Sequence, residues 1–225
     1  MKQVLVTLGD PAGIGPEVID AALDGFQPPA DVTIRIVGNR DAGTPGHPSK
    51  ASARAALDAL HQAGQQVKHG DADAVVTGPV AKEALQRLGF PFPGQTEFFA
   101  DLFGIEDFAM CLDGPTLCVV PVTIHLSLRD AVRLLDGVSI ERCGRLLAAH
   151  LLARGCAAPR IAVAGLNPHA GEGGAFGDDE QRTIAPAVER LNRGGTGATF
   201  HGPEVPDAVL DRKSTRLNSS HRIRS

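Results

Sequence analysis

The chain has 225 residues, of which 43% are hydrophobic, and a net charge of −4. Its length and apolar content are sufficient for one large domain or two smaller interleaved ones. Basic residues are scattered except at the extreme C-terminus, and no apolar run is long enough for a signal peptide or a membrane span. We therefore expect a cytoplasmic protein that binds neither nucleic acid nor membrane. The four cysteines lack Cys-x-x-Cys spacing and are expected to be reduced thiols in the core.

Short apolar runs alternate with helical patterns along most of the chain. Residues 4–8, 32–37 and 74–77 are predicted strands, and an alanine-rich helix is predicted over residues 49–62. This alternation is typical of an α/β protein whose mostly parallel sheet is covered by helices on both faces.

Glycines and a lysine follow the predicted strands of the N-terminal half. Residues 9–17 (GDPAGIGPE) place Pro16 in the first turn of a helix, where free backbone N–H groups favour an anion. The spacing is not that of the dinucleotide fingerprint, and a plain strand-to-helix turn explains these residues equally well. Lys82 closely follows the strand at residues 74–77 and could reach into a cleft, although an exposed helix lysine is the simpler interpretation.

Residues 94–97 (GQTE) open a predicted helix that runs to residue 102, and Thr96 could serve as its cap. Asp-Gly at residues 113–114 separates apolar runs at 108–112 and 117–122, which predicts an antiparallel hairpin. The second run continues to residue 124. Ser127 and Ser139 are the expected caps of the next two helices.

Histidines follow two of the predicted strands. His125 ends the apolar run 117–124, and His169 lies in residues 167–174 (NPHAGEGG), after a strand predicted at 161–166. Ligands collect at the carboxyl ends of parallel strands, and imidazole can ligate a divalent metal. An idle histidine in a turn would explain either residue alone, but the pair predicts two ligands of one metal site. A helix that begins with acidic residues is predicted over residues 178–191, and a strand is predicted near residues 198–201. These two elements complete the alternation of strands and helices.

Residues 212–225 are basic, polar and without periodicity. A disordered arm for nucleic acid or membrane is the usual interpretation of such a tail. We favour instead non-native sequence that follows a break in the gene.

Four segments in this order resemble motifs of the 4-hydroxythreonine-4-phosphate dehydrogenase family of vitamin B6 and pyridoxal phosphate biosynthesis. They are residues 9–17, 77–82 (TGPVAK), 94–97 and 167–174. The resemblance implies a fold like that of isocitrate and isopropylmalate dehydrogenases, with two α/β domains and a homodimer. It implies an oxidoreductase in which NAD or NADP oxidises 4-phosphohydroxy-L-threonine to a β-keto acid, which decarboxylates to 3-amino-2-oxopropyl phosphate.

The resemblance also implies roles for individual residues. It assigns His125 and His169 to a divalent metal, which could be zinc, magnesium, manganese or cobalt. Gln95 and Thr96 fall on substrate-binding positions, and Lys82 on a catalytic lysine. The family usually has histidine in place of Gln95, so a related dehydrogenase of erythronate or threonate 4-phosphate is an alternative. The residues that bind NAD or NADP are not identified.

The family's third metal histidine lies in a Tyr-His-Asp-Gln segment, and this chain contains no tyrosine. We therefore expect residues 1–211 to be an incomplete two-domain α/β dehydrogenase body with interleaved domains and a missing C-terminal part. Residues 212–225 are then a disordered, non-native tail. In a competing interpretation of a different class, the chain as given is an inactive fragment, and residues 212–225 favour this interpretation for the polypeptide, although not for the gene.

Overall fold

The computed structural model describes residues 1–209, so the predicted tail lies outside the described residues. The chain divides into two compact units, Met1–Glu106 and Asp107–Ser225. Each unit has a hydrophobic core of its own, and the units are described separately below.

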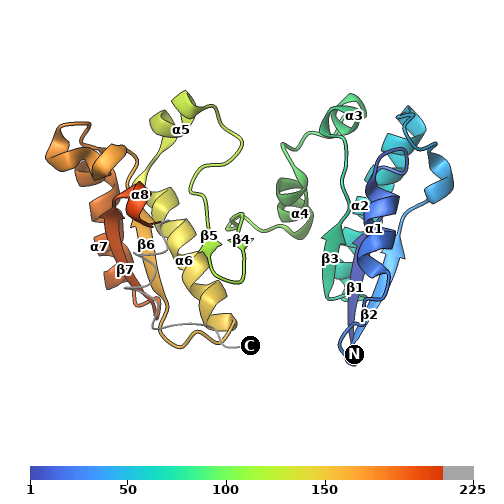
Figure 1. The fold of residues 1–225 in the computed structure, drawn as a ribbon, viewed down its shortest axis with the longest axis horizontal. Helices are drawn as coiled ribbons and strands as arrows, with labels where there is room; N and C mark the ends of the chain where they lie inside the picture. The colour runs from blue at the N-terminus through green and yellow to red at the C-terminus, as the bar shows by residue number, and fades with distance from the viewer. Residues whose placement is uncertain (210–225) are drawn as a thin grey trace. The chain divides into compact units, whose positions relative to one another are not determined.

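The first unit is built on a parallel sheet with strand order β2-β1-β3 (Figure 1). Its strands are β1 (Lys2–Thr7), β2 (Val32–Val37) and β3 (Ala74–Thr77). Successive side chains of a strand point to opposite faces, so Leu5 and Val6 of β1 serve different cores. Leu5 packs with Ala59 and Ala63 of α2 (Lys50–His69), and Val6 packs with Ile19 of α1 (Gly15–Leu23). Both faces of the sheet are therefore covered by helices, as predicted.

Helix α2 is longer than its sequence pattern predicts. Ser49 caps it by accepting the backbone N–H of Ser52, and Gly70 ends it with a left-handed φ of 81°. The polar and glycine-containing stretch after residue 62 is also helical, and Gly64 within it is a packing position. A Cβ at Gly64 would lie 2.3 Å from Leu102 Cδ2 of α4 (Gln95–Phe103). Glycine at this position therefore permits α4 to lie close against α2.

A third core in this unit joins α2 and α4 to α3 (Lys82–Arg87). The extended arm before α4 contributes Phe90, whose ring centroid lies 5.6 Å from that of Phe98. Leu57, Leu60 and Leu85 are buried around these rings. This aromatic packing fixes the arm and the start of α4.

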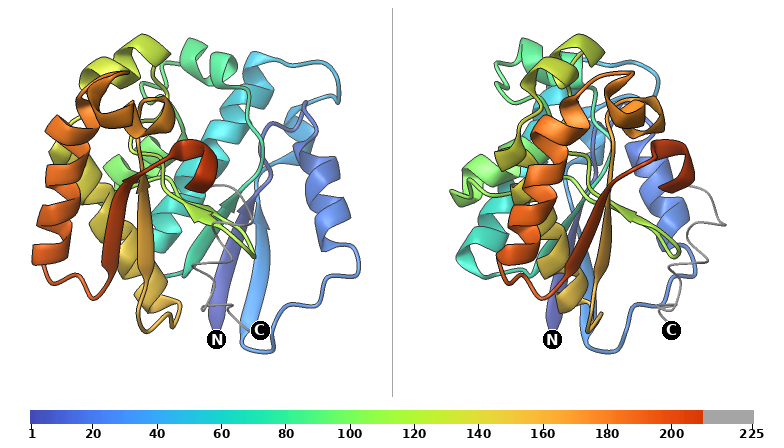
Figure 2. Two further views of the ribbon diagram at one scale, coloured as in Figure 1. Left: turned by 60° about the vertical axis from the view of Figure 1, so that its left-hand side comes forward. Right: turned by 90° about the vertical axis from the view of Figure 1, so that its left-hand side faces the viewer.

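The second unit pairs β6 (Arg160–Ala164) with β7 (Thr199–Glu204) in parallel, next to α6 (Gly137–Ala153) and α7 (Ala185–Arg193) (Figure 1 and Figure 2). Its core is formed by apolar side chains of these four elements, among them Ile140, Leu147, Ile161, Leu191 and Phe200. The unit also contains the hairpin strands β4 (Leu112–Asp113) and β5 (Cys118–Val119), the short helices α5 (Leu128–Leu134) and α8 (Pro206–Val209), and two irregular helical segments, Pro168–Gly174 and Glu180–Ile184.

The predicted hairpin is confirmed but is shorter than expected. Leu112 pairs with Val119 and Asp113 with Cys118, and β5 then ends. The prediction of a strand as far as residue 124 was wrong. Pro121, which lacks an N–H group, interrupts the apolar run. His125 therefore does not follow directly on a strand end, whereas His169 comes soon after β6.

Two predictions of helix starts in this unit also need correction. Ser127 caps α5 as predicted, but Ser139 does not cap α6. Asp136 is the cap, because its carboxylate accepts the Ser139 N–H at 2.8 Å and the Ser139 hydroxyl at 2.9 Å. The helix predicted from residue 178 begins as a π-helical turn, Glu180–Ile184, before α7.

The cysteines differ in environment more than the sequence suggested. All four are free thiols, as expected, and Cys143 is buried. Cys111 is exposed, so the prediction of a core position was wrong for this residue. Among residues 1–209, no helix combines the length and the apolar character that crossing a membrane requires.

Candidate functional site

In the first unit, the loops that follow β1 and β3 meet. The backbone N–H of Asp10 donates to the Pro79 carbonyl at 3.0 Å. Gly9 has a left-handed φ of 74°, and a Cβ there would lie 2.3 Å from the same oxygen. The segments 9–17 and 77–82 are thus packed on each other at the carboxyl end of the sheet. The buried Asp10 carboxylate accepts the Ala12 N–H at 2.9 Å and so serves the turn itself.

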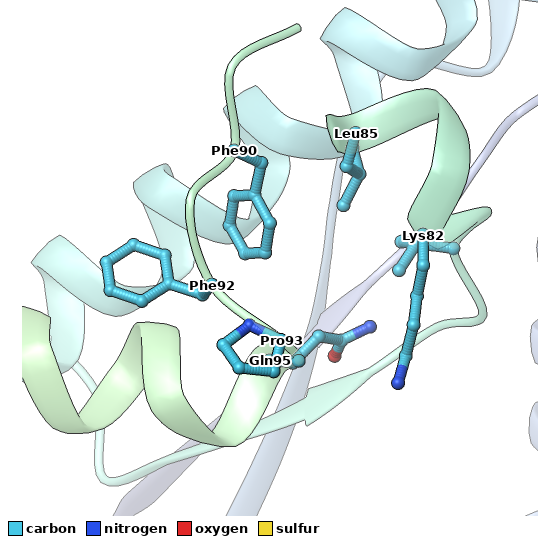
Figure 3. A pocket seen from close by; sticks show the side chains of 8 residues that line it. Lys82, Leu85, Phe90, Phe92, Pro93 and Gln95 are labelled. Carbon is cyan, nitrogen blue, oxygen red and sulfur yellow. The ribbon is translucent and has the colours of Figure 1, made fainter. Parts of the chain in front are cut away.

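Beyond this junction lies a cavity of about 90 Å³ between α3 and the start of α4. Figure 3 shows the Gln95 amide directed toward the Lys82 side chain, with aromatic rings of the preceding arm across the cavity. The lining residues are Val80, Lys82, Leu85, Phe90, Phe92, Pro93, Gly94 and Gln95. Two of the predicted site residues, Lys82 and Gln95, therefore line one cavity.

The starts of two helices position these side chains. Lys82 is the first residue of α3 and is exposed, and Gln95 is the first residue of α4 and is half-buried. Thr96 is the second residue of α4, next to Gln95, and does not line the cavity. The cap position belongs to Gly94, so the interpretation of Thr96 as a helix cap was wrong.

In the second unit, the segment around His169 has an unusual backbone. Five consecutive residues, from 169 to 173, have left-handed dihedral angles, with φ values between 43° and 77°. Three of them, His169, Ala170 and Glu172, are not glycine. Left-handed conformation costs about 1–2 kcal/mol for each such residue. The surrounding structure must offset this strain.

Glu180 provides that support. Its carboxylate is 2% exposed and accepts the backbone N–H groups of Leu166 at 2.8 Å and Asn167 at 2.7 Å. The Asn167 side-chain amide donates to the other carboxylate oxygen at 3.0 Å. Burial raises the pKa of Glu180, but the hydrogen bonds from Asn167 and Leu166 outweigh burial and lower the pKa below its ordinary value. A charged, buried carboxylate therefore holds the residues immediately before His169.

Glu180 was missed in the sequence, where it reads as one of several acids at a helix start. Its role depends on hydrogen bonds between parts of the chain that come together only in the folded structure, and no local sequence pattern indicates them. The carboxylate bonds to backbone groups 13 and 14 residues earlier in the chain.

His125 and His169 both lie in the second unit, and both are exposed. Each has a left-handed backbone, with φ of 57° and 53° respectively. Strained non-glycine residues concentrate at functional sites, where surrounding contacts impose the conformation. Two exposed imidazoles suit zinc or cobalt better than magnesium. That the two rings face one ion stays a prediction, and Lys82, Gln95 and Thr96 belong to the other unit.

Comparison with solved structures defines the class of protein. A putative 4-hydroxythreonine-4-phosphate dehydrogenase from Salmonella typhimurium is similar, with a TM-score of 0.78 and 31% identity, covering 93% of this chain and 77% of that one. The enzyme of the same name from Klebsiella pneumoniae has a TM-score of 0.78 and 32% identity, covering 96% and 79%. A terephthalate 1,2-cis-dihydrodiol dehydrogenase from Burkholderia xenovorans has a TM-score of 0.62 and 29% identity, and the match covers 93% of this chain and 75% of that one. The fold is thus the expected α/β fold of the isocitrate and isopropylmalate dehydrogenase type.

The chain belongs to the family of the pyridoxal phosphate biosynthetic protein PdxA, whose model matches residues 16–218. The 4-hydroxythreonine-4-phosphate dehydrogenase of Bradyrhizobium diazoefficiens is 43% identical in an alignment of 213 positions that covers 91% of this chain and 61% of that protein. The enzyme of Zymomonas mobilis is 37% identical in an alignment of 253 positions, gaps included, that covers 95% of this chain and 75% of that protein. The chain therefore spans between three fifths and three quarters of these relatives, and the expected family is confirmed.

Proposed function

We propose that the protein is a metal- and NAD(P)-dependent dehydrogenase of vitamin B6 biosynthesis. Its substrate is 4-phosphohydroxy-L-threonine, which is oxidised to a β-keto acid that loses CO2 to give 3-amino-2-oxopropyl phosphate. The observation that carries the proposal is that Lys82 and Gln95, from two of the family motifs, line one cavity at the carboxyl end of a parallel sheet. We further propose that it acts in the cytoplasm as a homodimer.

The residues of the cavity suit an anionic, hydroxylated substrate. The Lys82 ammonium supplies a positive charge for a carboxylate or phosphate group. The Gln95 amide can donate a hydrogen bond to a substrate oxygen but can neither carry a charge nor transfer a proton. Thr96 follows Gln95 in α4 but does not line the cavity, and its proposed contact with the substrate rests on the family resemblance alone. Phe90 and Phe92 give the cavity an apolar wall, which limits water around the bound groups.

We assign His125 and His169 as two ligands of the divalent metal, with zinc or cobalt preferred because both donors are nitrogen. A metal held by these two residues would polarise the hydroxyl group that is oxidised, and NAD(P)+ would supply the hydride acceptor. Two imidazoles leave coordination positions for a further ligand and for the substrate. Glu180 is a positioning residue in this proposal, because it fixes the backbone that precedes His169.

The substrate is tested by following NADH or NADPH formation with the metal-loaded protein. We expect turnover of 4-phosphohydroxy-L-threonine and weaker turnover of erythronate and threonate 4-phosphates, in keeping with the names of the relatives. Faster turnover of erythronate or threonate 4-phosphate would favour the alternative, a dehydrogenase of one of those two substrates. No turnover of any of the three would contradict the proposed reaction for this chain.

The role of Gln95 is tested by Gln95→His. If Gln95 contacts the substrate, kcat/KM should change by roughly tenfold to a hundredfold, the effect of one altered polar contact of about 1–3 kcal/mol. Gln86→His is the matched control, because Gln86 is exposed on α3 and does not line the cavity. Equal kcat/KM values for Gln95→His and the unmodified protein would remove Gln95 from the site.

A further inference from the structure

The second unit contains a cluster of metal-binding side chains that the proposed dehydrogenase site does not use. The cluster consists of Cys111, Cys118 and His150. Each residue offers one potential ligand atom, and these three atoms lie within 4.8 Å of one another. The two sulfur atoms are 3.3 Å apart. We propose that this cluster is a second metal site, specific for a thiophilic divalent ion such as zinc. The proposal is independent of the dehydrogenase reaction.

The hairpin register brings the two thiols to one face. Asp113 pairs directly with Cys118, so their side chains lie on the same face of the ribbon. Cys111 lies immediately before β4, and the 3.3 Å between its sulfur and that of Cys118 places its side chain on that face as well. One face of a short hairpin therefore carries two sulfur atoms and one carboxylate.

Helix α6 supplies the third ligand. His150 lies in its last turn, and Arg154 follows it by four residues, so both project from the same side of the helix. The His150 Nε2 atom is 3.4 Å from Asp113 Oδ2, and Arg154 forms an ion pair with the same carboxylate. Cys118 also packs against the core that α6 helps to form. These contacts hold the imidazole against the hairpin, whose strands β4 and β5 lie beside α6 (Figure 1).

The spacing fits zinc better than a disulfide. Zinc–sulfur bonds of about 2.3 Å at tetrahedral angles separate two thiolates by roughly 3.8 Å. A disulfide needs about 2.05 Å between the sulfur atoms, and it makes no use of a third donor. The observed 3.3 Å is closer to the thiolate separation, and a ring nitrogen of His150 lies within 4.8 Å of both sulfurs.

The charges also favour a divalent ion. Two thiolates and the Asp113 carboxylate carry three negative charges, whereas Arg154 carries one positive charge. A divalent cation makes the total zero. Sulfur and imidazole ligands select zinc, or cobalt as its substitute, over magnesium and calcium, which prefer oxygen. Cys111 is exposed and the His150 side chain is 39% exposed, so an ion can enter from solvent.

Cobalt(II) is the probe that distinguishes this site from the histidine site. We expect the reduced, full-length chain to develop thiolate-to-cobalt charge-transfer absorption that zinc abolishes by displacement. Cys111→Ser or Cys118→Ser should remove that absorption, and His150→Ala should weaken cobalt binding by at least about tenfold. Cys156→Ser is the matched control and should leave the spectrum unchanged, because this partly exposed thiol lies outside the cluster. The double variant His125→Ala/His169→Ala should retain the absorption, since imidazoles cannot produce it.

Far-UV circular dichroism would verify that each variant is folded. In a second measurement, zinc should protect Cys111 and Cys118, but not Cys156, from alkylation. Absence of the charge-transfer band in the unmodified chain would overturn the proposal. So would a band that persists in both single serine variants, or equal alkylation of all three thiols with and without zinc.

Discussion

Replacing Glu180 with glutamine tests whether a buried carboxylate maintains the left-handed backbone around His169. The amide retains one carbonyl oxygen for the N–H groups of Leu166 and Asn167, but it sets an NH2 group against the Asn167 side-chain amide, now 3.0 Å from the carboxylate. Hydrogen bonds to a charged group contribute about 1.5–3 kcal/mol each, and neutral ones about 0.5–1.5. Weakening three bonds by about 1 kcal/mol each gives a loss of roughly 2–4 kcal/mol. The strain of three left-handed non-glycine residues is of similar size, about 3–6 kcal/mol, so the loop should leave this conformation.

The assay must avoid intrinsic fluorescence of tryptophan and tyrosine, since the chain contains neither. Urea unfolding followed by far-UV circular dichroism measures the free energy, and hydrogen exchange of the Leu166 and Asn167 amides reports directly on the loop. Glu189→Gln is the control. Glu189 forms an exposed ion pair with Arg193 on α7, which contributes only about 0.5 kcal/mol. If Glu180→Gln were as stable as Glu189→Gln, with both amides still protected, the reasoning would be refuted.

The pH dependence of the free energy of unfolding of Glu180→Gln tests whether the Glu180 carboxylate is charged. The pKa of Glu180 is lower in the folded protein than its ordinary value of 4.5. Its stabilisation is therefore complete above about pH 4.5 and is lost as the pH falls through the lower, folded pKa. The difference in unfolding free energy between the unmodified protein and Glu180→Gln should be constant from pH 5 to 7 and shrink in more acidic solution. A difference that grows with acidity would contradict the assignment of a charged carboxylate.

Two further pairs of substitutions test the packing and the corrected helix start. Gly64→Ala should lower the free energy of unfolding by about 1–3 kcal/mol, because its Cβ meets Leu102 at 2.3 Å. Gly194→Ala, whose Cβ would make only ordinary contacts, should be neutral within about 0.5 kcal/mol in the same urea titration. Asp136→Ala should lower stability by about 0.5–2 kcal/mol through loss of the α6 cap, and Ser139→Ala by less. The opposite order in thermal denaturation would restore Ser139 as the cap.

The sequence was sufficient for the features that depend on local patterns. Alternating apolar runs predicted the α/β class, and Asp113-Gly114 predicted the position of the hairpin. An apolar run alone does not reveal where a strand ends, so β5 was extended past Pro121. Asp136 and Ser139 are both good cap residues, and only the observed hydrogen bonds distinguish between them.

The candidate site was predictable where it coincides with motifs and not where it depends on distant contacts. Lys82 and Gln95 were singled out from their positions and from the family resemblance, and they do line one cavity. The left-handed run through His169 was hidden, because non-glycine residues adopt it only with tertiary support such as that of Glu180. The thiol cluster was hidden for a similar reason. Cys111 meets His150 only after the hairpin packs beside α6.

The shared metal site of His125 and His169 is tested most directly by NMR of the cobalt(II)-loaded protein in a Cys111→Ser/Cys118→Ser background, which removes the thiol site. With one equivalent of cobalt, we expect hyperfine-shifted ring-proton resonances from two histidines. His125→Ala should remove one set and weaken cobalt binding for the other, and His169→Ala should do the converse. Unshifted resonances for either histidine, or two cobalt ions bound independently, would contradict a common site.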